Sequence, residues 1–508
     1  NQNPTICCQN TLVAKIDQGG QLVLSRQVQL FYVKMEHSVH ISIHMRAILV
    51  VTASWLMALA AMSLADQANH DILIQNVTTI DAISRKQANQ SVLIRDGQIS
   101  MIDKAGKISA TASIIIEGTD KFLIPGLWDM HVHIIYEPRL TELMPRLFLD
   151  YGVTSVRDTG ALLHEIQPEI LRWRSMGALA PDIFFSGPLL DGSLVVYDGN
   201  GRTEIGTPNA TAASADEQIA QLHHAGIDFI KIYELVSPEV FNSMVQTAHR
   251  LGLPIAAHVP LSMKADEAGP QVNSMEHLRN IEIACADNAN QLHKDRKRAL
   301  EFPGNSSGYK LRSHLHNTQR TVALKTAKTG SKHCQQVIRS LRDTIQVPTL
   351  RLNTISRFSP ELRPDWNDQL KSLPKDVAAE WMEIARYFAA HPSELGNQMS
   401  DWSLALVEAM HRAGVPIGAG TDTPIGQAIP GYSLHTELER LVAAGLNPLE
   451  AIASATIAPA SFFKLTDTIG QIQPGMEADL VLLHADPLVD IRNTRAIVTV
   501  ISDGQIVR

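Results

Sequence analysis

The sequence has 508 residues, of which 45% are hydrophobic and 19% are charged, and its net charge is −8 at pH 7. This length and composition are typical of a soluble enzyme with one large domain and a smaller one, because such a chain can bury a sizeable core. The mild acidity, without a basic stripe interleaved with aromatic residues, argues against nucleic acid as the main partner.

Residues 45–65 have the features of a secretory signal peptide. One positive charge precedes a short apolar run, which ends in small residues up to Ala65. A membrane anchor is the alternative, but the run is at the short end for a span. We therefore expect residues 1–44 to precede the true start at Met45, and we expect a periplasmic or secreted protein without a stable membrane anchor. Its mature chain should begin near Asp66.

Two cysteines remain in the expected mature chain, Cys285 and Cys334, whereas Cys7 and Cys8 lie upstream of the expected start. In an exported protein such a pair is a candidate disulfide. Two free buried thiols are the alternative.

Both ends of the mature chain resemble β structure. An Asp-Gly pair at 96–97 lies between apolar runs, which indicates a hairpin, and an Asp-Gly-Gln-Ile motif recurs at 503–506. We predict one small β-sandwich built from residues 66–124 and 466–508, with residues 125–465 inserted into it.

The middle of the chain alternates strand-like runs with helical ones. The strand-like runs are 127–134, 154–159, 182–187, 229–233, 254–259, 274–278, 346–352 and 416–422. Amphipathic segments at 215–225, 238–251 and 377–390 lie between them. Eight such strands alternating with helices predict a (β/α)8 barrel over residues 125–465. A doubly wound open sheet is the alternative, but no Gly-x-Gly-x-x-Gly follows any of the strands.

A long connection, residues 279–345, carries a basic run from Lys294 to Lys332. Connections after barrel strands lie over the active face, so one interpretation is a positively charged lid. A solvated helical face is the other interpretation.

Polar residues recur where the predicted strands end. The first strand ends in His131 and His133, whose side chains share one face because they are two residues apart. The other members of the set are Lys231, His258, His277 and Asp422. Each alone has a structural explanation, but together at equivalent strand positions they predict a metal site, since imidazoles and carboxylates bind divalent ions. His435, by contrast, is expected to be structural.

Three motifs accompany this set: Pro-Gly-x-x-Asp-x-His-x-His at 125–133, Gly-Val-Thr-Ser-Val-Arg-Asp-Thr-Gly at 152–160, and Gly-Met-Glu-Ala-Asp-Leu-Val-Leu at 475–482. With them, the chain resembles the amidohydrolase superfamily of metal-dependent hydrolases from about residue 70 to the end. The resemblance implies a binuclear centre, commonly zinc.

The resemblance also implies a role for each ligand. His131, His133 and Asp422 would bind the more buried ion, and His258 and His277 the more exposed one. Lys231 would be carboxylated and bridge both ions, since a carbamate is an anion whereas free lysine is a cation. A hydroxide between the ions would attack the substrate, and Asp422 would pass its proton to the leaving amine.

Lys231 and the lack of an acidic residue between His258 and Asp266 favour the binuclear branch similar to Xaa-Pro dipeptidases and imidazolonepropionase-like proteins over mononuclear deaminases. We expect a small-molecule substrate with a carboxylate, a dipeptide or an N-acyl amino acid. The candidate substrate contacts are Tyr233, Arg157 and Arg279. The alternatives are a hydrolase of lactones, cyclic amides or phosphoesters, and a non-enzymatic periplasmic binder of metal or solute. The sequence leaves open whether the protein is a homo-oligomer.

Overall fold

The computed structural model describes residues 12–16, 22–26 and 71–508, so the expected signal peptide, Cys7 and Cys8 lie outside the described residues. The chain forms two compact units, residues 1–68 and 69–508. In the first unit, β1 (Leu12–Ile16) pairs antiparallel with β2 (Leu22–Arg26). Within the described residues, no helix has the length and apolar character needed to cross a membrane.

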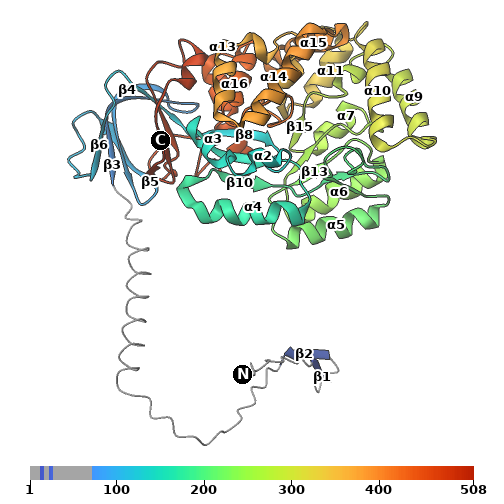
Figure 1. Ribbon diagram of the computed structural model, residues 1–508, viewed down its shortest axis with the longest axis horizontal. Helices are drawn as coiled ribbons and strands as arrows, with labels where there is room; N and C mark the ends of the chain where they lie inside the picture. The colour runs from blue at the N-terminus through green and yellow to red at the C-terminus, as the bar shows by residue number, and fades with distance from the viewer. Residues whose placement is uncertain (1–11, 17–21, 27–70) are drawn as a thin grey trace, which may run out of the picture. The chain divides into compact units, whose positions relative to one another are not determined.

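The second unit contains a β domain made from both ends of its chain (Figure 1). Its eight strands form one sheet in the order β19-β18-β17-β7-β3-β4-β5, with β6 beside β3. They are β3 (Ile72–Asp81), β4 (Arg85–Arg95), β5 (Gln98–Lys104), β6 (Ile114–Glu117), β7 (Phe122–Pro125), β17 (Leu480–Leu483), β18 (Ile497–Ser502) and β19 (Gln505–Ile506). The two chain ends meet where β7 pairs antiparallel with β17.

This sheet differs from the predicted sandwich because its hydrogen bonds join all eight strands into one sheet. Register shifts between β3 and β4 are the kind of irregularity that bends a sheet, and apolar side chains from both chain ends share one core, including Ile74, Leu123 and Leu482. The sheet therefore curves around that core.

The two Asp-Gly pairs form hairpin turns, as predicted. Asp96 and Gly97 between β4 and β5 have φ values of 50° and 77°, and Asp503 and Gly504 between β18 and β19 have φ values of 48° and 72°. Positive φ at both central residues is characteristic of the type I′ turn, which favours Asp-Gly. The turns lie against each other, since a Cβ on Gly504 would come within 2.6 Å of Gly97 Cα.

The inserted part of the chain is a mixed α/β region with parallel strands. Hydrogen bonds connect the strands in the orders β10-β9-β8 and β12-β11-β13-β14-β15-β16. The strands are β8 (Leu127–Val132), β9 (Val153–Asp158), β10 (Asp182–Phe185), β11 (Leu189–Asp191), β12 (Gly206–Pro208), β13 (Ile230–Ile232), β14 (Ile255–Ala257), β15 (Ser274–Glu276) and β16 (Ile345–Val347). Seven of the eight predicted strand runs overlap one of them.

The last predicted strand, 416–422, contains only isolated bridges. Parallel bridges pair Ile417 with Gln346 of β16 and Thr423 with Val132 of β8, so the segment runs between these two strands. The predicted run 346–352 also ends earlier than expected. Thr349 has a φ of 45°, and α12 (Leu350–Asn353) begins directly after it.

Helices lie on both sides of the parallel strands in Figure 1. They are α2 (Pro138–Thr141), α3 (Met144–Asp150), α4 (Leu163–Met176), α5 (Ala212–His224), α6 (Pro238–Leu251), α7 (Ala265–Ala268), α13 (Pro364–Gln369), α14 (Lys375–Ala390), α15 (Glu394–Arg412), α16 (Tyr432–Ala443), α17 (Pro448–Ser454) and α18 (Ile457–Phe462). The three predicted amphipathic segments correspond to α5, α6 and α14. One large core joins strand residues such as Ile232 to helix residues such as Phe241.

The long connection after β15 folds into four helices, which we call the α8–α11 connection: α8 (Ile281–Ala284), α9 (Ala289–Glu301), α10 (Gly308–Ala323) and α11 (Lys332–Ser340). A disulfide joins Cys285 at the end of α8 to Cys334 in α11. The basic residues of this connection differ in exposure. Its lysines are exposed, whereas Arg296 and Arg312 are buried and hydrogen-bonded to other side chains. The connection is therefore a solvated lysine face over buried arginines.

Candidate metal centre

The six predicted ligands lie at the carboxyl ends of the parallel strands and line one pocket. His131 belongs to β8 and Lys231 to β13, while the other members follow directly after their strands or bridged segments. All six are buried, with at most 5% of each residue exposed. A pocket with six buried ionisable groups is an unusual feature for a purely structural core, because burying such groups is costly unless they are paired or bind metal.

Two of these ligands have strained backbones. The φ values are 61° for His277 and 63° for Asp422, in the left-handed region that side chains other than glycine rarely occupy. Hydrogen bonds hold both in place, from Asp422 N to the His131 carbonyl and from His277 N to the Val347 carbonyl. Strain that the surrounding strands maintain in this way is typical of functional sites.

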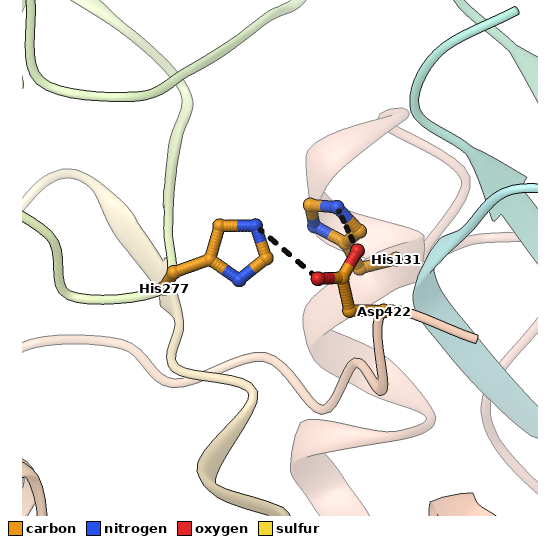
Figure 2. A group of neighbouring side chains, drawn as sticks. All are labelled: His131, His277 and Asp422. Atoms are coloured by element: carbon orange, nitrogen blue, oxygen red, sulfur yellow. Dashed lines mark ion pairs between the residues drawn. The ribbon is translucent and has the colours of Figure 1, made fainter. Parts of the chain in front are cut away.

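Figure 2 shows His131 and His277 facing opposite oxygens of the Asp422 carboxylate. One potential ligand atom from each residue lies within 4.8 Å of the other two. His131 Nε2 is 3.3 Å from Asp422 Oδ1, and His277 Nε2 is 4.0 Å from Oδ2. His133 Nε2 is also 3.3 Å from Oδ1, so Asp422 lies between His277 on one side and the two strand histidines on the other.

Each of the four histidines is oriented through its Nδ1 atom. The partners are Glu276 Oε2 for His131 at 2.7 Å, the Gly160 carbonyl for His133 at 3.0 Å, Glu234 Oε1 for His258 at 2.8 Å, and Thr349 Oγ1 for His277 at 2.8 Å. A hydrogen bond at Nδ1 fixes the ring and leaves Nε2 for a metal ion, which is the usual arrangement around metal-binding histidines.

Sequence reasoning missed the residues that orient these rings. Glu276 and Glu234 are completely buried, and each is adjacent to a predicted site residue, His277 or Tyr233. An acidic residue inside a predicted buried strand, as for Glu276, or directly after one, as for Glu234, was the signal that could have identified both.

Lys231 is buried, and its Nζ atom has no hydrogen-bond partner within the described part of the chain. Glu276 Oε1 is 4.0 Å away. Burial, which the charge of Glu276 opposes, lowers the pKa of Lys231 to about 8. Burial also lowers the pKa of His258 to about 4, which leaves it neutral, as a metal-binding imidazole must be. The orphaned amine and the nitrogen and oxygen donors together fit a divalent metal site.

Carboxylates in the site remain ionised despite their burial. Burial opposes the charge of Asp422, but His277 and His131 hold its pKa well below the usual range. For Glu276 the same opposition is overcome chiefly by Arg157, which holds the pKa of that carboxyl well below its usual range. The pocket therefore offers carboxylate oxygen next to imidazole nitrogens.

Two of the three predicted substrate contacts reach this pocket. Tyr233 and Arg279 line it together with Leu189, Tyr197, Ile205 and Ile425. Arg157 is a correction: it has no exposed surface and donates to the Met130 carbonyl, Ser274 and Glu276. Its guanidinium also lies over the Phe462 ring, 4.5 Å from the centroid. These protein contacts occupy Arg157 behind the ligands, where it cannot meet a substrate carboxylate.

His435 makes structural hydrogen bonds and is not one of the residues that line the pocket. Its Nδ1 contacts Thr494 Oγ1 at 2.8 Å and its Nε2 contacts the Tyr151 carbonyl at 2.9 Å. It therefore connects α16 to two other segments, a structural role as predicted.

Comparison with known proteins finds a family match in the C-terminal part of the chain. Residues 310–507 match the Amidohydrolase family. Asp422 lies inside the matched segment, whereas the other five predicted ligands precede it, and their assignment rests on the geometry described above.

Particular relatives resemble parts or the whole of the chain. Ochratoxinase of Aspergillus niger is 38% identical over 96 residues, 18% of this chain and 19% of that protein. The curated relatives are matched over less than a fifth of their own length. Among solved structures, bottromycin amidohydrolase has a TM-score of 0.63 at 21% identity and covers 87% of this chain and 88% of its own. A Xaa-Pro dipeptidase with bound methionine in its active site has a TM-score of 0.59 at 21% identity, covering 86% and 99%. At these identities the structural likeness concerns the fold.

Proposed function

We propose that this protein is a metal-dependent hydrolase that cleaves the C–N bond of dipeptides or N-acyl amino acids. The observation that carries the proposal is the convergence of the four histidines, Lys231 and Asp422 on one buried pocket that Arg279 and Tyr233 also line. The metal ligands would hold ions next to the amide carbonyl of a substrate, while the Arg279 guanidinium can bind its carboxylate and the Tyr233 hydroxyl can hydrogen-bond to it.

The scaffold of this activity is a (β/α)8 barrel in our proposal. The parallel strands on either side of segment 416–422, β16 and β8, both form bridges to it. A second contact brings β10 close to β13. The Asp228 amide donates to the Phe185 carbonyl at the end of β10, and β13 begins two residues after Asp228. These contacts support a closed ring with its active face at the ligand end.

The proposed centre would hold two divalent ions, zinc being the expected metal, with the four histidines, Asp422 and a carboxylated Lys231 as the ligands. Six ligand side chains exceed what one tetrahedral ion uses, which supports the second ion. Bound ions would polarise the scissile carbonyl and lower the pKa of a water molecule towards neutrality. Elemental analysis after zinc reconstitution should give two ions per chain, and one ion or fewer would contradict the binuclear proposal.

Asp422 is the proposed general base and acid. Its carboxylate lies at the centre of the ligand cluster, 3.3 Å from two imidazole nitrogens, so it can take a proton from the attacking water and deliver it to the leaving amine nitrogen. Its strained backbone and fixed amide keep the carboxylate aimed into the pocket.

The proposed substrate places its carboxylate against Arg279 and its side chain against the apolar wall. Leu189, Ile205 and Ile425 form that wall with the Tyr197 ring, which suits an apolar or aromatic amino acid. The structural neighbour solved with methionine in its active site is consistent with an amino acid of this kind.

A substrate screen tests this proposal. The zinc-loaded chain should hydrolyse members of a dipeptide and N-acyl amino acid library, and Asp422→Asn should lower kcat by about 10²- to 10⁴-fold, the usual contribution of a positioned base, with metal content unchanged. An unchanged kcat at full metal content would remove Asp422 from this role. Turnover of lactones, cyclic amides or phosphoesters, with no amide turnover, would replace the proposed substrate class.

We also propose that the protein is exported to the periplasm or secreted. The pattern of residues 45–65 supports export, and so does the disulfide between Cys285 and Cys334, because structural disulfides persist in oxidising compartments. Mass analysis of the native protein should find an N-terminus near Asp66; peptides from residues 1–44 would contradict this.

A further inference from the structure

Helix α10 of the α8–α11 connection reaches the metal centre through one carboxylate, that of Glu234. This side chain follows the pocket residue Tyr233 and is completely buried. Four basic groups surround its two oxygens: His258 Nδ1 at 2.8 Å, Arg312 Nη2 at 3.1 Å, His316 Nε2 at 2.6 Å and Arg279 Nη1 at 3.6 Å. Arg312 and His316 belong to α10, one helical turn apart.

The charges in this cluster do not cancel. Glu234 is a completely buried carboxylate, and two guanidinium groups lie close to it: that of Arg312 at 3.1 Å and that of Arg279 at 3.6 Å. Two arginines therefore face one carboxylate, which leaves an excess of positive charge beside the pocket.

The two arginines are not equivalent. Arg312 contacts both Glu234 oxygens, at 3.1 and 3.4 Å, and its side chain is 10% exposed. Arg279 has only the 3.6 Å contact, is 20% exposed, and lines the pocket. Arg312 thus holds the carboxylate from behind, while Arg279 faces the space where a ligand binds.

We propose that Arg312 is a specificity-determining residue, which neutralises Glu234 and thereby keeps Arg279 available for the carboxylate of a ligand. This inference rests on the proposed function, because the ligand carboxylate is that of the proposed substrate. Without Arg312, the buried Glu234 would take Arg279 as its only charged partner, since a buried carboxylate without a counter-charge is costly. The pocket would then lose its preference for an acid.

The same helix supplies a matched control. Arg320 of α10 forms an ion pair with Glu282, which is also completely buried, at 2.7 Å. Replacing Arg320 with methionine breaks an equivalent buried arginine–glutamate pair in the same helix and leaves the Glu234 cluster intact. Any effect that arises only from altered packing of α10 should appear in Arg320→Met as well.

The experiment compares zinc-loaded wild type with R312M, R312K and R320M. Calorimetry would measure the binding of 3-phenylpropionate and of its uncharged amide, 3-phenylpropionamide. Neither is an N-acyl amino acid, and the two differ only in the carboxylate. We expect the wild type and R320M to bind the acid at least about tenfold more tightly than the amide, roughly 1.4 kcal/mol. R312M should bind both equally, and R312K should retain most of the preference because it keeps the charge. Metal content is measured for every variant.

The outcomes separate this inference from the proposed function. A preference for the acid that survives in R312M overturns the role of Arg312 and leaves the proposed substrate class standing. Loss of the preference in R320M as well assigns the effect to helix packing, and loss of metal in R312M alone assigns it to the orientation of His258; both overturn the inference. A wild type that does not favour the acid shows that the carboxylate anchor itself is wrong.

Discussion

The candidate metal centre contains two similar clusters, in each of which a buried glutamate orients a histidine and pairs with an arginine. Glu276 orients His131 and pairs with Arg157, whereas Glu234 orients His258 and pairs with Arg312. Arg157 comes from strand β9 and has no exposed surface, while Arg312 comes from a helix of the α8–α11 connection and lies next to pocket residues.

The difference shows how one site can combine a fixed half and a variable half. On the Glu276 side the carboxylate, its arginine and the histidine all lie on or next to strands, whose register determines their positions. On the Glu234 side the counter-charge comes from a connection, and connections after strands are the part of such folds that changes most readily. We infer that the first half maintains the metal site and the second adapts it to a substrate.

The largest expected effect on activity comes from replacing Lys231, which lies 4.0 Å from Glu276 in the fixed half of the site. Lys231→Ala should remove the proposed bridge and abolish activity, with a loss of bound zinc measured by elemental analysis. Short carboxylic acids added to the variant should restore part of the activity, because they can replace the carbamate oxygens. Full activity in Lys231→Ala would show that the carbamate has no role.

Replacing each of the two arginines separately should lower the free energy of unfolding by different amounts in the two halves of the site. Arg157→Met removes the hydrogen-bonded counter-charge of the buried Glu276 carboxylate, and breaking a buried pair in this way typically costs about 3–5 kcal/mol of unfolding free energy. Arg312→Met should cost less, since Arg279 remains 3.6 Å from Glu234 and its side chain is partly exposed. Urea unfolding of both variants measures this, and equal losses would contradict the distinction between a fixed and a variable half.

Removing the disulfide tests whether the α8–α11 connection, which supplies the variable half, has a stability of its own. Cys285 and Cys334 are 49 residues apart, and they enclose α9 and α10. Closing a loop of this length stabilises a fold by typically about 2–4 kcal/mol. The double variant C285S/C334S should therefore unfold at lower urea concentration, and the loss should be accompanied by faster hydrogen exchange in α9 and α10 than in β8 or β13. Uniform exchange changes across all four elements would show that the connection is not a separate unit of stability.

The sequence predicted the strand-based Glu276 side of the site better than the Glu234 side, which depends on the α8–α11 connection. His131 and His133 share a strand face by their spacing alone, and the parallel strands could be located because each is a short buried apolar run. The pairing of Arg157 could not be predicted, because a strand arginine points either into the core or towards a ligand according to the register with its neighbours. The role of Arg312 was hidden for a different reason: it depends on a contact between residues 78 positions apart, in a run whose lysines are solvated.

The smallest expected effect concerns His435, a buried histidine without a carboxylate partner. Burial, with a smaller contribution from Arg495, lowers its pKa to about 3, compared with 6.5 in a model peptide. The unfolded chain therefore binds a proton at this residue as the pH falls below about 6.5, whereas the folded protein does not until about pH 3. Because the unfolded state binds more protons in this interval, the stability that depends on His435 is complete above about pH 7 and declines with falling pH. Between pH 7 and 5.5 the decline should be about 1 kcal/mol.

His435→Gln removes this proton uptake while it keeps a side chain that can hydrogen-bond to Thr494 or to the Tyr151 carbonyl. The variant should be less stable than the wild type at pH 7, and the difference between the two should shrink by about 1 kcal/mol at pH 5.5, as measured by urea unfolding at both pH values. Acidic protonation of other groups, and any loss of metal, affect both proteins alike and cancel in the difference. A difference that stays constant or grows with falling pH would mean that His435 is protonated in the folded protein, and that burial without a carboxylate does not keep a histidine neutral at this position.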